Sequence, residues 1–220
     1  MYQSWGKLLF MHWRVPAGDL RRLIPERLTI DTYEDSAWIA ITPFVLWNVR
    51  PVLVPPIPGV SEFNEVNCRT YVTLDNKPGV WFFSLDADSR LASSAARLFY
   101  RLPYHFAEIH ISESDNRIDY DMQRGDFGLR ARWTVRDDMP PSSPGSLEFF
   151  LTERYCLYAE RDRQLYRARI FHQPWPLQKA TIDSYESSMI EVLGLKSRRD
   201  EPALNYVEAI DVEIWAIKRL

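Results

Sequence analysis

The feature that most constrains the fold is a succession of short segments with β-strand composition, separated by turn residues. The segments are rich in β-branched and aromatic residues, and their side chains alternate so that every second residue shares a face. Many short strands in succession predict an antiparallel, strand-dominated protein. We expect strands over residues 36–47, 63–74, 79–87, 104–112, 117–124, 127–136, 147–159, 164–172 and 205–217.

Helices are expected in three places. Apolar spacing between Val15 and Leu28 predicts one short helix, and a cap at Asp88 or Ser89 predicts a second that ends before Pro103. A capping-box pattern predicts a third helix over 184–193, closed by Gly194. In the second helix, four apolar residues share one face: Leu91, Ala95, Leu98 and Leu102.

The chain shows no internal repeat and no shift in composition, so the sequence predicts a single domain over residues 1–220 of α+β class, with two or three helices. Prolines and a glycine between residues 51 and 60 predict an extended loop, not a domain linker. These residues are Pro51, Pro55, Pro56, Pro58 and Gly59. Pro43 favours a bulge or an edge position for the strand over 36–47.

Composition excludes several classes of partner. The net charge of −3 lacks the excess of lysine and arginine that nucleic-acid binding requires. The apolar run Leu8–Met11 is too short for a signal peptide or a membrane span, so we expect no membrane partner and a cytoplasmic location. Cys68 and Cys156 lie far apart in apolar stretches and are expected to be buried free thiols.

Motifs for cofactors are also missing. The sequence contains no Gly-x-Ser-x-Gly elbow, Walker loop or Gly-x-Gly-x-x-Gly turn, which argues against a nucleotide cofactor. The four histidines never form a His-x-His or His-x-x-x-His pair, so no metal site is expected from spacing. They are His12, His105, His110 and His172. We therefore expect no cofactor.

The strand over 63–74 has one chemically functional face. Period two separates Glu65, Asn67, Arg69, Tyr71 and Thr73 from Val66, Cys68, Thr70, Val72 and Leu74. In a flat sheet the polar face would meet water. In a closed or coiled sheet it would line a cavity, where Arg69 can bind a carboxylate and Glu65 can move protons. The neighbouring strand 79–87 is apolar on both faces, which favours the cavity.

Two further groups of residues invite a chemical interpretation. Alternation over 104–112 places His105 on the drier side of its strand, either as a hydrogen-bonded core residue or as a catalyst. Glu153 and Arg154 lie within the expected strand 147–159. They form either an ion pair on a solvated face or a charged pair in the same pocket as Arg69.

Several motifs together resemble the YqjF-like family of bacterial proteins, over nearly the whole chain. They are His12-Trp13-Arg14-Val15-Pro16, Asn67-Cys68-Arg69-Thr70-Tyr71-Val72, Gly79-Val80-Trp81-Phe82-Phe83-Ser84-Leu85-Asp86-Ala87, Leu102-Pro103-Tyr104 and Leu151-Thr152-Glu153-Arg154-Tyr155. The resemblance implies an acetoacetate-decarboxylase-like fold, a coiled antiparallel sheet that forms a cone-like barrel around a ligand cavity.

The same resemblance weighs against imine chemistry. Acetoacetate decarboxylases carry Pro-Lys-Lys before an apolar residue, and one lysine forms a Schiff base with the ketone. Here the matching segment is Pro103-Tyr104-His105-Phe106, and neither substituted side chain can form that bond. The lysines of this chain lie at termini, turns or polar segments, where a desolvated amine is not expected. They are Lys7, Lys77, Lys179, Lys196 and Lys218.

The sequence leads to two hypotheses about function. In the first, a small carboxylate- or carbonyl-bearing organic ligand binds in the barrel cavity, with or without non-imine, lyase-like acid–base chemistry. Its catalytic candidates are Tyr104, His105 and Glu65, and its substrate-binding candidates are Arg69, Tyr71, Glu153 and Arg154. In the second, the protein is a structural or interaction protein whose exposed aromatics form a homodimer or partner interface.

Overall fold

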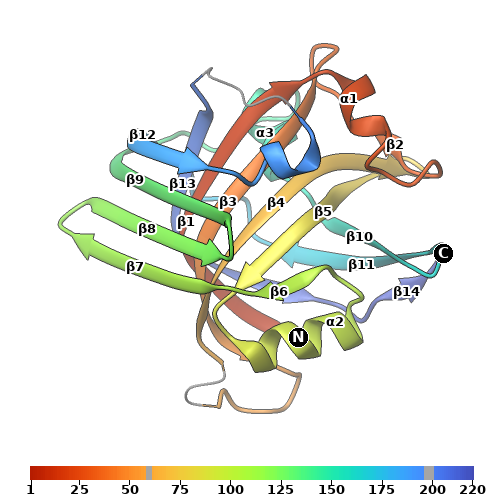
Figure 1. Ribbon diagram of the computed structural model, residues 1–220, viewed down its shortest axis with the longest axis horizontal. Helices are drawn as coiled ribbons and strands as arrows, with labels where there is room; N and C mark the ends of the chain where they lie inside the picture. The colour runs from red at the N-terminus through yellow and green to blue at the C-terminus, as the bar shows by residue number, and fades with distance from the viewer. Residues whose placement is uncertain (58–60, 196–200) are drawn as a thin grey trace.

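The computed structural model describes residues 1–57, 61–195 and 201–220. Strands dominate it, which confirms the α+β, strand-dominated class (Figure 1). The strands are β1 (Tyr2–Val15), β2 (Thr29–Ile30), β3 (Ala37–Arg50), β4 (Phe63–Leu74), β5 (Lys77–Ala87), β6 (Tyr104–Phe106), β7 (Glu108–Ser114), β8 (Arg117–Arg124), β9 (Phe127–Asp138), β10 (Cys156–Arg161), β11 (Gln164–His172), β12 (Gln178–Ser187), β13 (Ala203–Ile214) and β14 (Lys218–Arg219). The helices are α1 (Ala17–Arg21), α2 (Arg90–Phe99), α3 (Leu147–Thr152) and the short 3₁₀ helix η1 (Glu191–Leu193).

Part of the sheet closes on itself. The neighbours β13, β1, β3, β4, β5, β10 and β11 pair in that order, and β11 pairs again with β13 through Ile170 and Ile214. The result is a ring of strands around an interior space (Figure 1). Most contacts are antiparallel, whereas β5 and β10 run parallel over a short stretch. Gly79 permits this contact, because a Cβ there would lie 2.6 Å from the carbonyl oxygen of Cys156.

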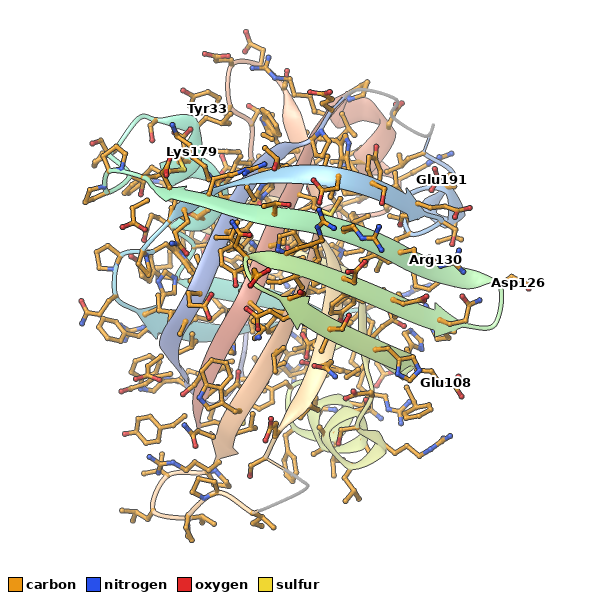
Figure 2. All side chains as sticks on the ribbon, turned by 90° about the vertical axis from the view of Figure 1, so that its left-hand side faces the viewer. Tyr33, Glu108, Asp126, Arg130, Lys179 and Glu191 are labelled. Atoms are coloured by element: carbon orange, nitrogen blue, oxygen red, sulfur yellow. The ribbon has the colours of Figure 1, made fainter. Side chains whose placement is uncertain are left out.

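A second layer covers one outer side of the ring. β12 continues the sheet from β13 and is followed by β9, β8 and β7. Figure 2 shows these strands lying across β13, β1, β3 and β4, with Arg130 on the layer and Asp126 at the tip of one of its turns. Apolar side chains from both layers pack between them and form an outer core. A separate apolar cluster lies inside the ring.

Residues 2–15 form a strand that we did not expect from the sequence. In β1, Leu8 and Phe10 point into the ring, whereas Leu9 and Met11 join the outer core. A strand that is buried on both faces has apolar residues at successive positions, so its sequence shows no alternation between apolar and polar residues. The short run Leu8–Met11 is therefore explained as a doubly buried strand.

The hairpin of β4 and β5 lies where the sequence predicts it. Asp75 and Asn76 form a two-residue turn with positive φ angles of 51° and 55°, the geometry that matches the twist of a hairpin. The meander over β7, β8 and β9 is also confirmed. Pro43 lies in a central strand, not at an edge, but it coincides with an irregularity in the pairing of β1 with β3.

Two predicted elements are wrong. The expected strand over 147–159 begins as α3, whose cap Ser146 accepts a hydrogen bond from the Phe149 amide at 3.2 Å, and only then becomes β10. The expected helix over 184–193 is instead the end of β12, a turn and the short η1. Asp183 does not cap a helix but accepts a hydrogen bond from Thr134 of β9 at 2.9 Å. Cross-strand pairing outweighed the local capping signal, and only Gly194 at the end of η1 plays its expected role.

Three smaller findings complete the description. Pro58, Gly59 and Lys196 lie outside the described residues. No helix in the described ranges combines the length and the apolar character needed to cross a membrane. Cys68 is a buried free thiol, as expected, whereas Cys156 is also free but only partly buried.

Candidate functional site

The interior of the ring contains a cavity of about 1060 Å³. Its lining residues at one end are buried, including Arg69, Thr152 and Trp175. At the other end Leu91 and Phe99 of α2 are 67% and 65% exposed. The cavity therefore has a closed floor and a mouth between α2 and the segment 51–57, at the lower edge of the view in Figure 1.

Strand β4 gives the cavity its polar side. Glu65, Asn67 and Arg69 all line it, and all three are nearly inaccessible to solvent. Their positions follow from the alternation of β4, which continues without interruption along the wall. The polar face thus meets an enclosed space and not bulk water.

A bulge in β5 explains why the facing strand is apolar on both sides. Cys68 pairs with Ser84 and Arg69 pairs with Phe82, so Phe83 is an extra residue in β5. Before the bulge Val80 and Phe82 line the cavity, and after it Leu85 does so. The residues of the opposite face belong to the outer core.

Glu65 and Tyr104 form a buried pair. The Tyr104 hydroxyl donates a hydrogen bond of 2.7 Å to Glu65 Oε2, and β6 brings Tyr104 to this point by pairing with Leu85. Burial raises the pKa of Glu65 to about 8, although the Tyr104 hydrogen bond acts against the rise and the nearby Asp86 charge adds to it. Burial also raises the pKa of Tyr104 well above its ordinary value. At pH 7 both groups carry protons, which makes Glu65 an acid and not a fixed negative charge.

Arg69 is a buried cation with no carboxylate partner among the described residues. Its guanidinium lies 5.1 Å from the centre of the Phe10 ring, and its Nε atom is buried without a hydrogen-bond acceptor. The Oδ1 atom of Asn67 is likewise buried without a donor. Buried polar atoms in native proteins are nearly always paired, and both residues line the cavity, so a ligand or water bound there could complete their hydrogen bonds.

The floor of the cavity is held by a second arginine. Arg154 forms an ion pair of 2.5 Å with Asp31 and donates from Nε to the Phe150 carbonyl oxygen at 2.7 Å. It also lies over the rings of Tyr71 and Phe150, at 4.9 Å and 4.3 Å. Part of the Arg154 side chain lines the cavity, but the Asp31 carboxylate already neutralises its charge.

Tyr71 lies just below this floor and does not line the cavity. Its hydroxyl is 2.6 Å from Nε2 of His12. Burial raises the pKa of Tyr71, whereas burial and the positive charge of Arg69 lower the pKa of His12 well below its ordinary value. Both groups are therefore neutral, and they support Arg69 from behind without neutralising it.

His172 is a cavity residue that we did not select from the sequence. It stacks on Tyr155 with 4.6 Å between ring centres, and it also packs against Trp175. Its Nδ1 lies 2.8 Å from the Gln173 carbonyl oxygen, which only an N–H can satisfy, so Nε2 carries the lone pair. That Nε2 is buried with no hydrogen-bond partner, and burial lowers the pKa of the ring. No spacing signal marks this histidine, because its neighbours come from distant segments.

Glu153, another sequence candidate, lies outside the cavity wall. Glu153 accepts a hydrogen bond from the Trp175 amide at 3.2 Å and another from the Tyr155 hydroxyl, so it anchors the loop beneath His172. The interpretation of Glu153 and Arg154 as an ion pair on a solvated face is wrong, because both are buried and Arg154 pairs with Asp31.

His105 is only partly buried, which corrects its expected place on a dry face. The strand breaks at Ala107, between β6 and β7, so the alternation that placed His105 with the aliphatic residues does not extend across this segment. Burial and the neighbouring Arg124 lower its pKa. Its backbone pairs with Asp86, whose side chain faces away from the cavity.

The cavity contains no lysine among its described lining residues. Lys7, Lys77 and Lys218 lie on the surface or in turns, and Lys179 is exposed on β12 (Figure 2). An imine between a described lysine and a ligand in the ring is therefore ruled out by position. The polar groups that a ligand would meet include a proton donor at Glu65, a cation at Arg69 and a lone pair at His172.

Solved structures with the same fold include a biosynthesis enzyme and proteins described as acetoacetate decarboxylases or decarboxylase-like enzymes. The enduracididine biosynthesis enzyme MppR complexed with pyruvate matches with a TM-score of 0.70 and 14% identity, over 99% of this chain and 89% of that one. An acetoacetate decarboxylase-like enzyme from Sphingomonas wittichii RW1 matches with a TM-score of 0.68 and 13% identity, over 100% and 92% of the two chains. At such identities the likeness establishes the fold alone.

Sequence comparison gives the family. A protein of Bacillus subtilis (strain 168) described as "Uncharacterized protein YqjF" is 40% identical over 222 residues, which cover 100% of this chain and 92% of that protein. The family model DUF2071, described as "Uncharacterized conserved protein", matches residues 2–211. The chain therefore belongs to the DUF2071 family and is a relative of YqjF.

Proposed function

We propose that this protein binds an organic carboxylate inside the ring, with the carboxylate on Arg69. The observation that carries the proposal is the buried guanidinium that faces a cavity and has no anionic partner among the described residues. Keeping an unpaired charge away from water is costly, and a bound carboxylate would offset that cost. Asn67 lies beside Arg69 on the same face and offers an amide to a neighbouring polar atom of the ligand.

The protonation of Glu65 supports a second role, acid–base catalysis without an imine. A carboxylic acid with a pKa near 8 is poised to give or take a proton at physiological pH. Its Tyr104 partner would stabilise the carboxylate that remains after the proton leaves. A ligand carbonyl next to Glu65 would be polarised by this proton, which is what a lyase-like step at the adjacent carbon requires.

Binding is best tested by isothermal titration calorimetry with carboxylates that range from pyruvate and butanoate to hexadecanoate. We expect at least one of them to bind the wild type and to lose about a hundredfold in affinity in Arg69→Met, since a charged hydrogen-bonded contact is worth about 1.5–3 kcal/mol or more when desolvated. Arg130→Met is the matched control, because Arg130 is exposed on β9 and remote from the cavity. Equal affinity in Arg69→Met would overturn the proposal.

The exposed apolar residues at the mouth favour the alternative of an interaction surface. Leu53 is 96% exposed, and Leu98 and Phe99 are also largely exposed. Analytical ultracentrifugation of the wild type and of Leu53→Glu would show whether this surface associates with a second copy. An interaction protein predicts that the substitution abolishes association and that no carboxylate binds. The cytoplasmic location expected from the sequence stays a prediction.

A further inference from the structure

We infer that the ligand is an amphiphilic carboxylate, an acid head joined to an extended apolar body, and not a short oxo acid. This inference rests on the proposed function, because it takes Arg69 as the site of the head. It concerns the remainder of the cavity, which the binding of a carboxylate alone leaves unexplained.

The size of the cavity is the first argument. Pockets of about 300–1000 Å³ enclose ligands of drug size, and this cavity of about 1060 Å³ is slightly larger than the upper end of that range. A short acid at Arg69 would leave most of the apolar wall without contact, and such contacts supply much of the binding energy of a pocket. The space is therefore matched to a larger molecule.

The distribution of polarity is the second argument. Unpaired polar atoms gather at the floor, at Arg69, Asn67 and His172. From there to the mouth most of the wall is apolar, although Arg50, Glu213 and a few uncharged polar residues also line the cavity. The apolar side chains come from several elements. They are Phe44, Leu46, Phe63, Phe82, Leu85, Leu102 and Phe99. This gradient matches a molecule with one polar end.

The Glu65–Tyr104 pair does not interrupt this gradient. Glu65 is protonated at neutral pH, and its Oε2 atom already accepts the Tyr104 hydrogen bond. The pair presents a neutral surface along which an uncharged chain can lie. An ionised carboxylate in the same place would repel the head and disfavour the body.

The course of β4 along the cavity wall indicates how long the ligand must be to reach the mouth. Phe63 precedes Arg69 by six residues on this strand, which corresponds to about 20 Å at about 3.3 Å per residue. A ligand whose head is held at Arg69 must pass Asn67 and Glu65 before it reaches Phe63 and the mouth. Only an extended body can contact the whole wall.

The rim of the mouth continues the apolar wall into solvent. Leu91, Phe99 and Trp215 line the cavity and are 67%, 65% and 42% exposed. Contiguous exposed apolar residues beside a cavity are characteristic of ligand grooves. The far end of a long ligand would lie against these side chains and cover them.

A chain-length series tests the inference. Butanoate, octanoate, dodecanoate and hexadecanoate are titrated into the wild type by calorimetry below their critical micelle concentrations, beside the alcohols of equal length. We expect affinity to rise about fourfold per added methylene until the chain leaves the mouth, which is the value of about 0.8 kcal/mol per buried methylene expressed as a ratio. The alcohols should bind at least tenfold more weakly than the acids.

A variant at the mouth distinguishes the contribution of the apolar body of the ligand from that of its carboxylate head. Ala95 lines the cavity on exposed α2, so Ala95→Trp should narrow the passage without disturbing the core. Ser94→Trp is the matched control, because Ser94 is exposed on the same helix and does not line the cavity. We expect Ala95→Trp to lower the affinity for dodecanoate at least tenfold and the affinity for butanoate less than twofold. Ser94→Trp should change neither affinity.

The outcomes distinguish the two claims. If butanoate binds through Arg69 and longer acids bind no better, the inference about the body is wrong and the carboxylate site stands. If long acids and alcohols bind equally and Arg69→Met has no effect, the carboxylate site itself is wrong. If affinity rises with length, depends on Arg69 and falls in Ala95→Trp, both claims are supported.

Discussion

The inside of the ring and the outer core differ in whether a buried charged side chain has a partner of opposite charge. In the outer core Asp86 is fully buried, and it receives a 2.6 Å hydrogen bond from Arg124 and another from Ser84. Inside the ring, on the neighbouring strand of the same hairpin, Arg69 has no carboxylate partner among the described residues. The outer core packs its apolar side chains closely, whereas the ring encloses an open cavity.

This difference separates structural from functional polarity. A charged group that the chain neutralises itself stabilises the fold or at least does not oppose it, as with Asp86 and with Arg154 on Asp31. A charged group that the chain leaves unpaired has a cost that only an outside molecule can offset. Of the two arginines at the cavity floor, Arg154 has a carboxylate partner and Arg69 has none among the described residues. Arg69 is therefore the candidate for binding a ligand.

The largest expected effect concerns the pH dependence that Glu65 confers. Its pKa rises from 4.5 to about 8 on folding, so the folded state holds a proton that the unfolded state releases. Stability is therefore fully present below pH 4.5 and falls by about 1.4 kcal/mol per pH unit as pH rises toward 8. Urea unfolding between pH 5 and 8 should show this slope in the wild type and not in Glu65→Gln. Identical slopes would mean that Glu65 is ionised inside the ring.

A somewhat smaller loss is expected when the outer pair is broken. Arg124→Met leaves the Asp86 carboxylate buried without its cation and should lower the free energy of unfolding by about 3 kcal/mol at pH 7. Arg132→Met is the control, since its pair with Asp119 is exposed and should be worth less than about 1 kcal/mol. Equal losses in the two variants would remove the distinction between buried and exposed pairs.

Closure of the ring itself is tested at Gly79. A Cβ there meets the Cys156 backbone at 2.6 Å, so Gly79→Ala must push β5 and β10 apart and should cost about 2 kcal/mol in the free energy of unfolding. Gly18→Ala is the control, because nothing lies within 4 Å of a Cβ at that helical position and alanine favours the helix. Thermal unfolding compares them. A Gly79→Ala protein as stable as the wild type would show that the strands can separate at no cost.

The smallest effect on stability is expected for Arg69. Replacing an unpaired buried cation with an apolar side chain of similar length should leave the ligand-free protein as stable as before or more stable by about 1 kcal/mol. Chemical denaturation of Arg69→Met beside Arg124→Met gives the direct comparison. A loss of 3 kcal/mol in Arg69→Met would indicate a structural partner and would erase the contrast between the two regions.

Much of the fold could be predicted from local pattern. The β4–β5 hairpin, the meander and α2 each have strong signals in alternation, turn residues or capping, and each lies where it was expected. The failures fall where long-range pairing decides. Residues 182–186 carry the capping-box pattern, yet this segment pairs with β9. Strand β1 shows no alternation because both of its faces are buried.

The candidate site likewise has features that the local sequence predicts and features that only long-range contacts decide. The sequence by itself determined that Glu65, Asn67 and Arg69 share one face of a strand, because side-chain alternation is a local property of the backbone. The resemblance to the decarboxylases implied that Tyr104 and His105 stand where those enzymes carry their lysine pair, and this correspondence stays a prediction.

Only the tertiary structure decided that this face is enclosed, since closure depends on the pairing of β11 with β13 between residues far apart in the chain. The same closure brings His172 to the cavity and leaves His105 and Glu153 outside its wall. It also pairs Arg154 with Asp31 and leaves Arg69 without an anion among the described residues. Which charges meet is set by contacts across the sheet, and no local pattern encodes them.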